Sequence, residues 1–146
     1  MQELSLVSRV VLWALLIVMG LFAMLVMGWQ IMVVKGKAMK NPDGTVDDWH
    51  EQKILYGMAL ADIFVACPMC LIGIALVIAD PRWGHYLLAM GAFWFVWGNA
   101  MTTATSLRFE KPKLTLSWFF TFPFGALVGL AYIVWTVVHF DSIYVR

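Results

Sequence analysis

Four long apolar runs, separated by short polar connections, limit the folds open to this chain more than any other feature of the sequence. A helix needs about 20 apolar residues to cross about 30 Å of hydrocarbon. We therefore expect membrane spans near residues 4–34, 54–79, 85–107 and 114–140. A membrane barrel would instead show alternating segments of about 10 residues. The chain is predicted to be an all-α integral membrane protein, with residues 1–146 forming one four-helix domain.

Composition and loop length support this prediction. Hydrophobic residues make up 62% of the chain and charged residues 13%, against about 45–50% and about 25% in soluble domains. The net charge of +1 provides no basic face for nucleic acid. Because short connections make neighbouring helices antiparallel, the expected fold is an antiparallel bundle, with the lipid bilayer as its first partner.

The basic residues predict the orientation of the bundle. Seven lie in the first and third connections, namely Lys35, Lys37, Lys40, Lys53, Arg108, Lys111 and Lys113. The opposite side has only Arg9, Arg82 and Arg146. Cytoplasmic loops carry the excess of Lys and Arg, so both termini are expected on the non-cytoplasmic side of a bacterial inner membrane. Within the first connection, residues 41–44 predict a turn, and Asp48 with Glu51 resembles a capping box.

A polar layer is predicted inside the cytoplasmic half of the bundle. Asp62 lies eight residues into the second span, or about 12 Å deep. Asn99 and Thr121 share this depth, and Thr102 and Thr103 lie nearer the surface, as do Ser117 and Gln30 on the same side. Intramembrane acids commonly mark binding or proton sites. The competing interpretation is structural: Asp62 would hydrogen-bond to Asn99 and the threonines as a link between helices.

The run Cys67-Pro68-Met69-Cys70 forms a C-x-x-C pair at the middle of the second span. Such a pair can be a redox dithiol or, with Met69, part of a Cu(I) site. The apolar depth favours inert structural thiols instead. In helix count and this one C-x-x-C, the chain is similar to the DsbB and vitamin K epoxide reductase families, but it lacks their second cysteine pair. Pro68 should kink the helix.

Histidines and glycines give further candidates. His85 and His139, each near an outer helix end, could together ligate a b-type haem or simply lie at the membrane interface. Gly125 and Gly129 form a G-x-x-x-G pair that permits close helix packing, within the bundle or against another subunit. Pro123, just before that pair, predicts a second kink. The dense aromatic residues 93–97 are expected mainly to face lipid.

No catalytic motif of the hydrolase, metalloprotease or nucleotide-binding kinds is present in the sequence, and no cofactor is required, although a bound lipid or quinone is compatible with it. With its length, helix count and early acidic residue Asp62, the chain resembles small bacterial membrane proteins of the DoxX type. That resemblance implies a subunit of a membrane oxidoreductase. The leading hypothesis is a non-catalytic accessory or scaffold subunit in contact with other membrane proteins. The alternatives are self-association with binding or transport of an apolar molecule, proton-coupled transport through Asp62, and thiol-redox or soft-metal chemistry at Cys67 and Cys70.

Overall fold

The computed structural model describes residues 4–36, 56–110 and 114–145, and within these ranges the regular elements are all helical. The first helix, α1, spans Leu6–Val34. A second continuous helix spans Tyr56–Ala79 and contains a π-helical turn, η1 (Asp62–Ala66), followed by α3 (Cys67–Ala79). Next come α4 (Pro81–Thr105) and a second π-helical turn, η2 (Ser106–Glu110). The chain continues with α5 (Leu116–Thr121), α6 (Pro123–Val138) and α7 (Phe140–Tyr144).

Local sequence sets several of these boundaries. Ser5 caps α1 by accepting a hydrogen bond from the backbone N–H of Ser8, at 3.1 Å, and Thr115 caps α5 in the same way through Trp118. Pro81 and Pro123 each occupy the first position of a helix, where the missing N–H is not needed. Only Asp80 separates α3 from α4, so the predicted outer turn is shorter than expected and α4 begins before His85.

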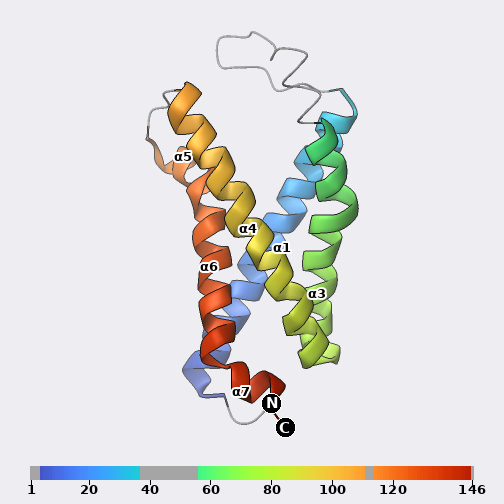
Figure 1. Cartoon of the computed structure of the whole chain (residues 1–146), viewed down its shortest axis with the longest axis vertical. Coiled ribbons are helices and arrows are strands. Elements are labelled where there is room, and N and C mark those ends of the chain that lie inside the picture. The colour runs from blue at the N-terminus through green and yellow to red at the C-terminus, as the bar shows by residue number, and fades with distance from the viewer. Residues whose placement is uncertain (1–3, 37–55, 111–113, 146) are drawn as a thin grey trace.

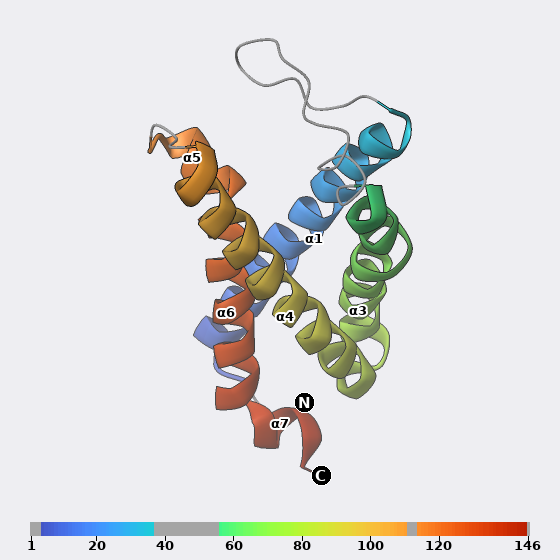
Figure 2. The same cartoon turned by 45° about the horizontal axis from the view of Figure 1, so that its top comes forward.

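The long helices run antiparallel to their neighbours in the chain, and α4 lies at the centre, packed against both α3 and α6 (Figures 1 and 2). The start of α1, the α3–α4 turn and α7 lie at one end of the molecule. There the Trp135 indole donates to the Ser8 carbonyl at 3.2 Å, joining α6 to α1. Toward the opposite end, the pair α1 and α3 diverges from the pair α4 and α6 (Figure 2).

Close helix contact depends on glycine. A Cβ on Gly129 would lie 2.6 Å from the Ala92 carbonyl oxygen of α4, and one on Gly125 would collide with the Asn99 side chain. The Gly125–Gly129 pair therefore lies at an internal packing surface, between α6 and α4. Gly84 plays the same part between α4 and α3, where a Cβ would overlap the backbone of Leu76 and Val77.

The four predicted spans are met only in part. Among the described residues, two helices, Leu6–Val34 and Tyr56–Ala79, are long and apolar enough to cross a membrane, and Pro123–Val138 is a shorter apolar helix. The fourth run is divided at Phe122, whose backbone φ of −108° and ψ of −75° ends α5 before Pro123. The third helix, α4, has the length but includes Arg82, His85 and a polar end that reduce its apolar character.

Both prolines perturb their helices as predicted, by different means. Pro123 breaks the helix, whereas Pro68 follows a π-helical turn in which the Cys67 N–H donates to the Asp62 carbonyl, five residues back. A proline removes one hydrogen bond and crowds the carbonyl four residues earlier, and a wider turn relieves that crowding. The predicted turn at residues 41–44, the capping box of Asp48 and Glu51, and the basic residues of 37–53 and 111–113 lie outside the described residues.

Candidate functional site

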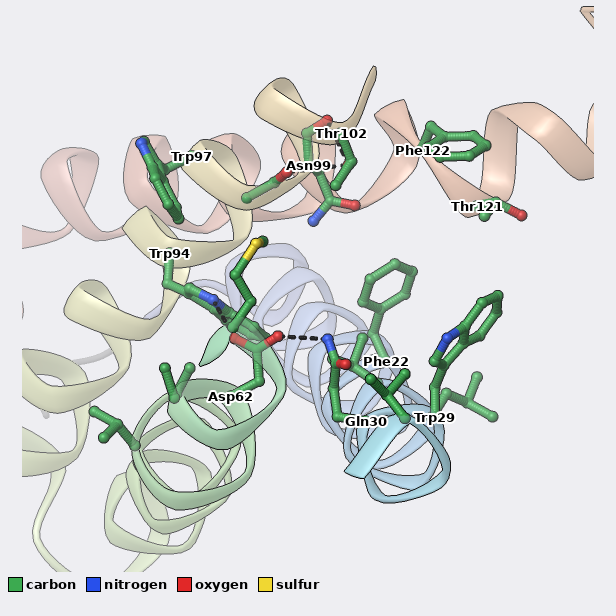
Figure 3. Close-up of a pocket in the computed structure, with 18 of the residues that line it drawn as sticks. Phe22, Trp29, Gln30, Asp62, Trp94, Trp97, Asn99, Thr102, Thr121 and Phe122 are labelled. Carbon is green, nitrogen blue, oxygen red and sulfur yellow. Dashed lines mark hydrogen bonds between the residues drawn. The ribbon is translucent and has the colours of Figure 1, made fainter. Parts of the chain in front are cut away.

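Asp62 is held by two nitrogen donors from two other helices (Figure 3). The Gln30 side-chain amide of α1 donates to Oδ2 at 2.7 Å, and the Trp94 indole of α4 donates to Oδ1 at 3.1 Å. Hydrogen bonds to a carboxylate are among the stronger ones in proteins. The carboxyl group therefore links three helices.

Asp62 is also the first residue of η1. The π-helical turn between it and Pro68 changes the direction in which the first half of this helix presents its side chains to α1 and α4. Single π-turns of this kind are frequent at functional sites. Pro68 follows this turn, so the irregular backbone lies between the carboxylate and the proline six residues later.

A cavity of about 1350 Å³ opens beside Asp62, between α1, the helix Tyr56–Ala79, α4 and α5. Its polar lining residues are Gln30, Asp62, Asn99, Thr102, Ser117 and Thr121. Aromatic side chains form much of the remaining wall, namely Phe22, Trp29, Tyr56, Trp94, Trp97, Phe120 and Phe122. A concave, mainly apolar space with a few polar groups is the usual form of a small-molecule site.

The structure brings most of the predicted polar layer to this one cavity but not into one hydrogen-bond network. Asn99 and Thr102 lie across the cavity from Asp62 (Figure 3), and Thr121 also lines it, while Thr103 does not. The Asn99 amide donates to the Phe95 carbonyl at 2.9 Å. The predicted hydrogen bonds between Asp62 and Asn99 or the threonines are wrong, because Gln30 and Trp94 take those positions.

The three threonines bond to their own helices. Thr102 donates to the Gly98 and Asn99 carbonyls, Thr103 to the Asn99 carbonyl at 2.5 Å, and Thr121 to the Ser117 carbonyl at 2.8 Å. Such back-bonding is common for Ser and Thr within apolar helices. Each hydroxyl proton is then used inside the chain, although Thr102 and Thr121 are among the residues that line the cavity.

Trp94 belongs to the candidate site although the sequence alone did not single it out. It was grouped with aromatic side chains expected to face lipid, and Phe93 and Trp97 are indeed 65% and 55% exposed. Trp94 instead turns inward toward Asp62, and Phe95 is fully buried in the core. A signal was present, because a tryptophan carries an indole N–H that requires an acceptor when it leaves water.

Cys67 and Cys70 are both fully buried free thiols. Among the described residues, no group of three or more His, Cys, Asp or Glu side chains is placed to hold a metal ion. Met69 lines the cavity, whereas the two thiols do not. These positions agree with structural cysteines packed in the bundle.

His85 corrects the prediction of an interfacial histidine, because its side chain is 0% exposed. Its Nδ1 lies 2.7 Å from the Tyr132 hydroxyl, and its ring stacks on Trp135 at 5.4 Å between centroids. His139 stacks on the same indole at 4.4 Å and has both ring nitrogens hydrogen-bonded, to the Trp135 carbonyl and the Ser8 hydroxyl. The two histidines therefore brace the closed end of the bundle, and His139 has no ring nitrogen left for a haem iron.

No protein-family model, curated protein or solved structure matches the chain. The resemblance to DoxX-type proteins thus remains one of length and layout.

Proposed function

We propose that this chain spans a bacterial inner membrane four times, with both termini outside. Exposed apolar surface supports the proposal. Only 22% of the most apolar stretch of Leu6–Val34 and 28% of that of Tyr56–Ala79 is buried, and exposed apolar areas this large are unusual in water-soluble monomers. The other two proposed crossings are α4 and α5–α6, which lie antiparallel to their neighbours (Figure 1). The seven basic residues in the first and third connections favour a cytoplasmic position for both connections, which four crossings provide.

Fusion of reporter enzymes to the C-terminus tests this topology. Alkaline phosphatase folds in the oxidising periplasm, whereas green fluorescent protein exported in an unfolded state does not become fluorescent there. We expect an active phosphatase fusion and a dark fluorescent fusion. The reverse pattern would place the C-terminus in the cytoplasm and refute the proposed orientation.

Within that membrane, we propose that the protein binds an apolar or amphipathic small molecule in the Asp62 cavity. The observation that carries the proposal is a half-buried carboxylate, Asp62, in the wall of a cavity of about 1350 Å³. Drug-sized ligands occupy pockets of about 300–1,000 Å³, so the space suits a molecule with an extended apolar body. Intramembrane acids are rare, and those that occur commonly face cavities and mark ligand or ion pathways.

Cavity filling tests binding directly. Gly98 lines the cavity, and a Cβ there would have its nearest neighbour, the Trp94 indole nitrogen, at 3.9 Å. Gly98→Leu should therefore fold and occupy the space. Gly28→Leu is the matched control, because Gly28 is exposed, has nothing within 4 Å of its Cβ position and does not line the cavity.

The readout is native mass spectrometry of each protein after gentle extraction from its own membrane. We expect a bound small molecule on the wild type and on Gly28→Leu, and its loss from Gly98→Leu. Equal adducts on all three proteins would show that the cavity is not the binding site. The accessory-subunit hypothesis stays a prediction, since exposed apolar helix faces suit lipid as well as a partner protein. Proton-coupled transport through Asp62 also stays a prediction.

A further inference from the structure

We propose that the ligand of the Asp62 cavity is an amphipathic organic cation, with an ammonium group beside Asp62 and an apolar body along the aromatic wall. This inference rests on the proposed function, because it requires that the cavity binds a small molecule. The proposed ligand carries no phosphate group.

Charge is the first argument. Asp62 is the only acidic residue that lines the cavity in the described chain, and none of the lining residues there is basic. Its contacts from α1 and α4 are the neutral donors Gln30 and Trp94. A carboxylate away from water is stabilised by an opposite charge. A ligand ammonium would supply that charge.

Hydrogen-bond polarity is the second argument. The Gln30 and Trp94 donors both point to Asp62, and the amide of Asn99 and the hydroxyls of Thr102 and Thr121 donate to backbone carbonyls. The Asp62 carboxylate has only acceptor oxygens. The Gln30 and Asn99 amides each keep an oxygen and a second N–H, and the Thr102 and Thr121 hydroxyls have already donated their single proton. An ammonium group has donors and no acceptor, so it complements the Asp62 carboxylate. A quinone carbonyl or a phosphate has acceptors and would meet the carboxylate.

The aromatic wall is the third argument. Trp29, Trp94 and Trp97 line the cavity together with Phe22, Phe120 and Phe122. The faces of aromatic rings attract cations, most strongly in tryptophan, and they also pack against apolar chains. One wall thus serves both parts of an amphipathic cation.

Dodecylammonium and dodecanol have the same alkyl chain and differ in the charge of the head group. Comparing their binding to the protein in a non-ionic detergent separates the contribution of the charge from that of the alkyl chain. Native mass spectrometry would give the bound fraction for the wild type, Asp62→Asn, Asp62→Glu, Gly98→Leu and Gly28→Leu. We expect dodecylammonium to bind the wild type, Asp62→Glu and Gly28→Leu. Binding should weaken about 10- to 100-fold in Asp62→Asn, the size expected for loss of a hydrogen bond to a charged group, and also in Gly98→Leu.

Other outcomes would overturn the proposal in distinguishable ways. If dodecanol or decylubiquinone binds as tightly as dodecylammonium, and Gly98→Leu weakens that binding while Asp62→Asn does not, the cavity binds ligands but not cations. If phosphatidylethanolamine displaces dodecylammonium, the site accepts a phosphate-bearing lipid headgroup. If Gly98→Leu and Gly28→Leu bind every probe alike, both the cation proposal and the proposed function fail.

Discussion

The contact between α3 and α4 at Gly84 leads to a quantitative prediction about stability. A Cβ on Gly84 would lie 2.5 Å from the Val77 Cα and closer still to the backbone atoms before it, whereas ordinary contacts are 3.4–4 Å. The two helices would have to separate by roughly 1 Å. Side-chain rotation cannot relieve the overlap, because the obstructing atoms are backbone. Overpacking costs typically 1–3 kcal/mol, and we expect Gly84→Ala to reach about 3 kcal/mol, on the order of a 100-fold shift toward the unfolded state.

Two internal probes make the assay simple. Cys67 and Cys70 are the only cysteines in the chain and both are fully buried, so a maleimide should modify them only when the bundle opens. Titration with sodium dodecyl sulfate in dodecyl maltoside micelles would give the detergent fraction at which the thiols become reactive. Gly84→Ala should react at a clearly lower fraction than the wild type.

Gly28→Ala is a control variant whose stability should change in the opposite direction. Gly28 lies within α1 with nothing near its Cβ position, and alanine is favoured over glycine in a helix interior by about 0.5–1 kcal/mol. This variant should match or exceed the wild-type midpoint. If Gly84→Ala and Gly28→Ala shared one midpoint, the close approach of α3 and α4 at Gly84 would be refuted.

Three further substitutions can be measured in the same titration. Trp94→Phe removes one of the two donors to Asp62 and should destabilise the fold by about 1–3 kcal/mol; a wild-type midpoint would contradict that hydrogen bond. Tyr132→Phe removes the hydroxyl beside the buried His85 ring and should lower stability by about 1–3 kcal/mol, so no change would show that the hydroxyl is not needed there. Pro68→Ala restores a backbone donor and should raise stability by about 1–3 kcal/mol, while a lower midpoint would show that the π-helical turn depends on proline.

The depth of each residue along its helix could be predicted from the sequence, but its direction around the helix could not. Counting residues from the helix ends predicted one level for Asp62, Asn99 and Thr121, and the structure places all three in the wall of one cavity. The apolar runs are hydrophobic on all sides, so no amphipathic pattern marked the inner face. The inward turn of Trp94 and the burial of His85 were missed for that reason.

Backbone irregularities explain most of the other differences. Residue types identified the two sites, Pro68 and Pro123, at which a helix would be perturbed. They did not distinguish the π-helical turn before Pro68 from the complete break at Phe122. The form of each perturbation depends on the packing of the neighbouring helices. Before Pro68, hydrogen bonds from α1 and α4 hold Asp62, the first residue of the π-helical turn, in place.

Trp135, His139 and Ser8 form a brace that fixes the relative position of two helices. It joins α1 and α6 at one end, while the Asp62 cavity opens where the helix pairs diverge. A helix of 29 residues such as α1 is about 44 Å long, so a rotation of about 5° at the brace moves its far end by about 4 Å. The Asp62 carboxylate also joins α1 to α4 beside the cavity, so the width of the opening depends on contacts at both places.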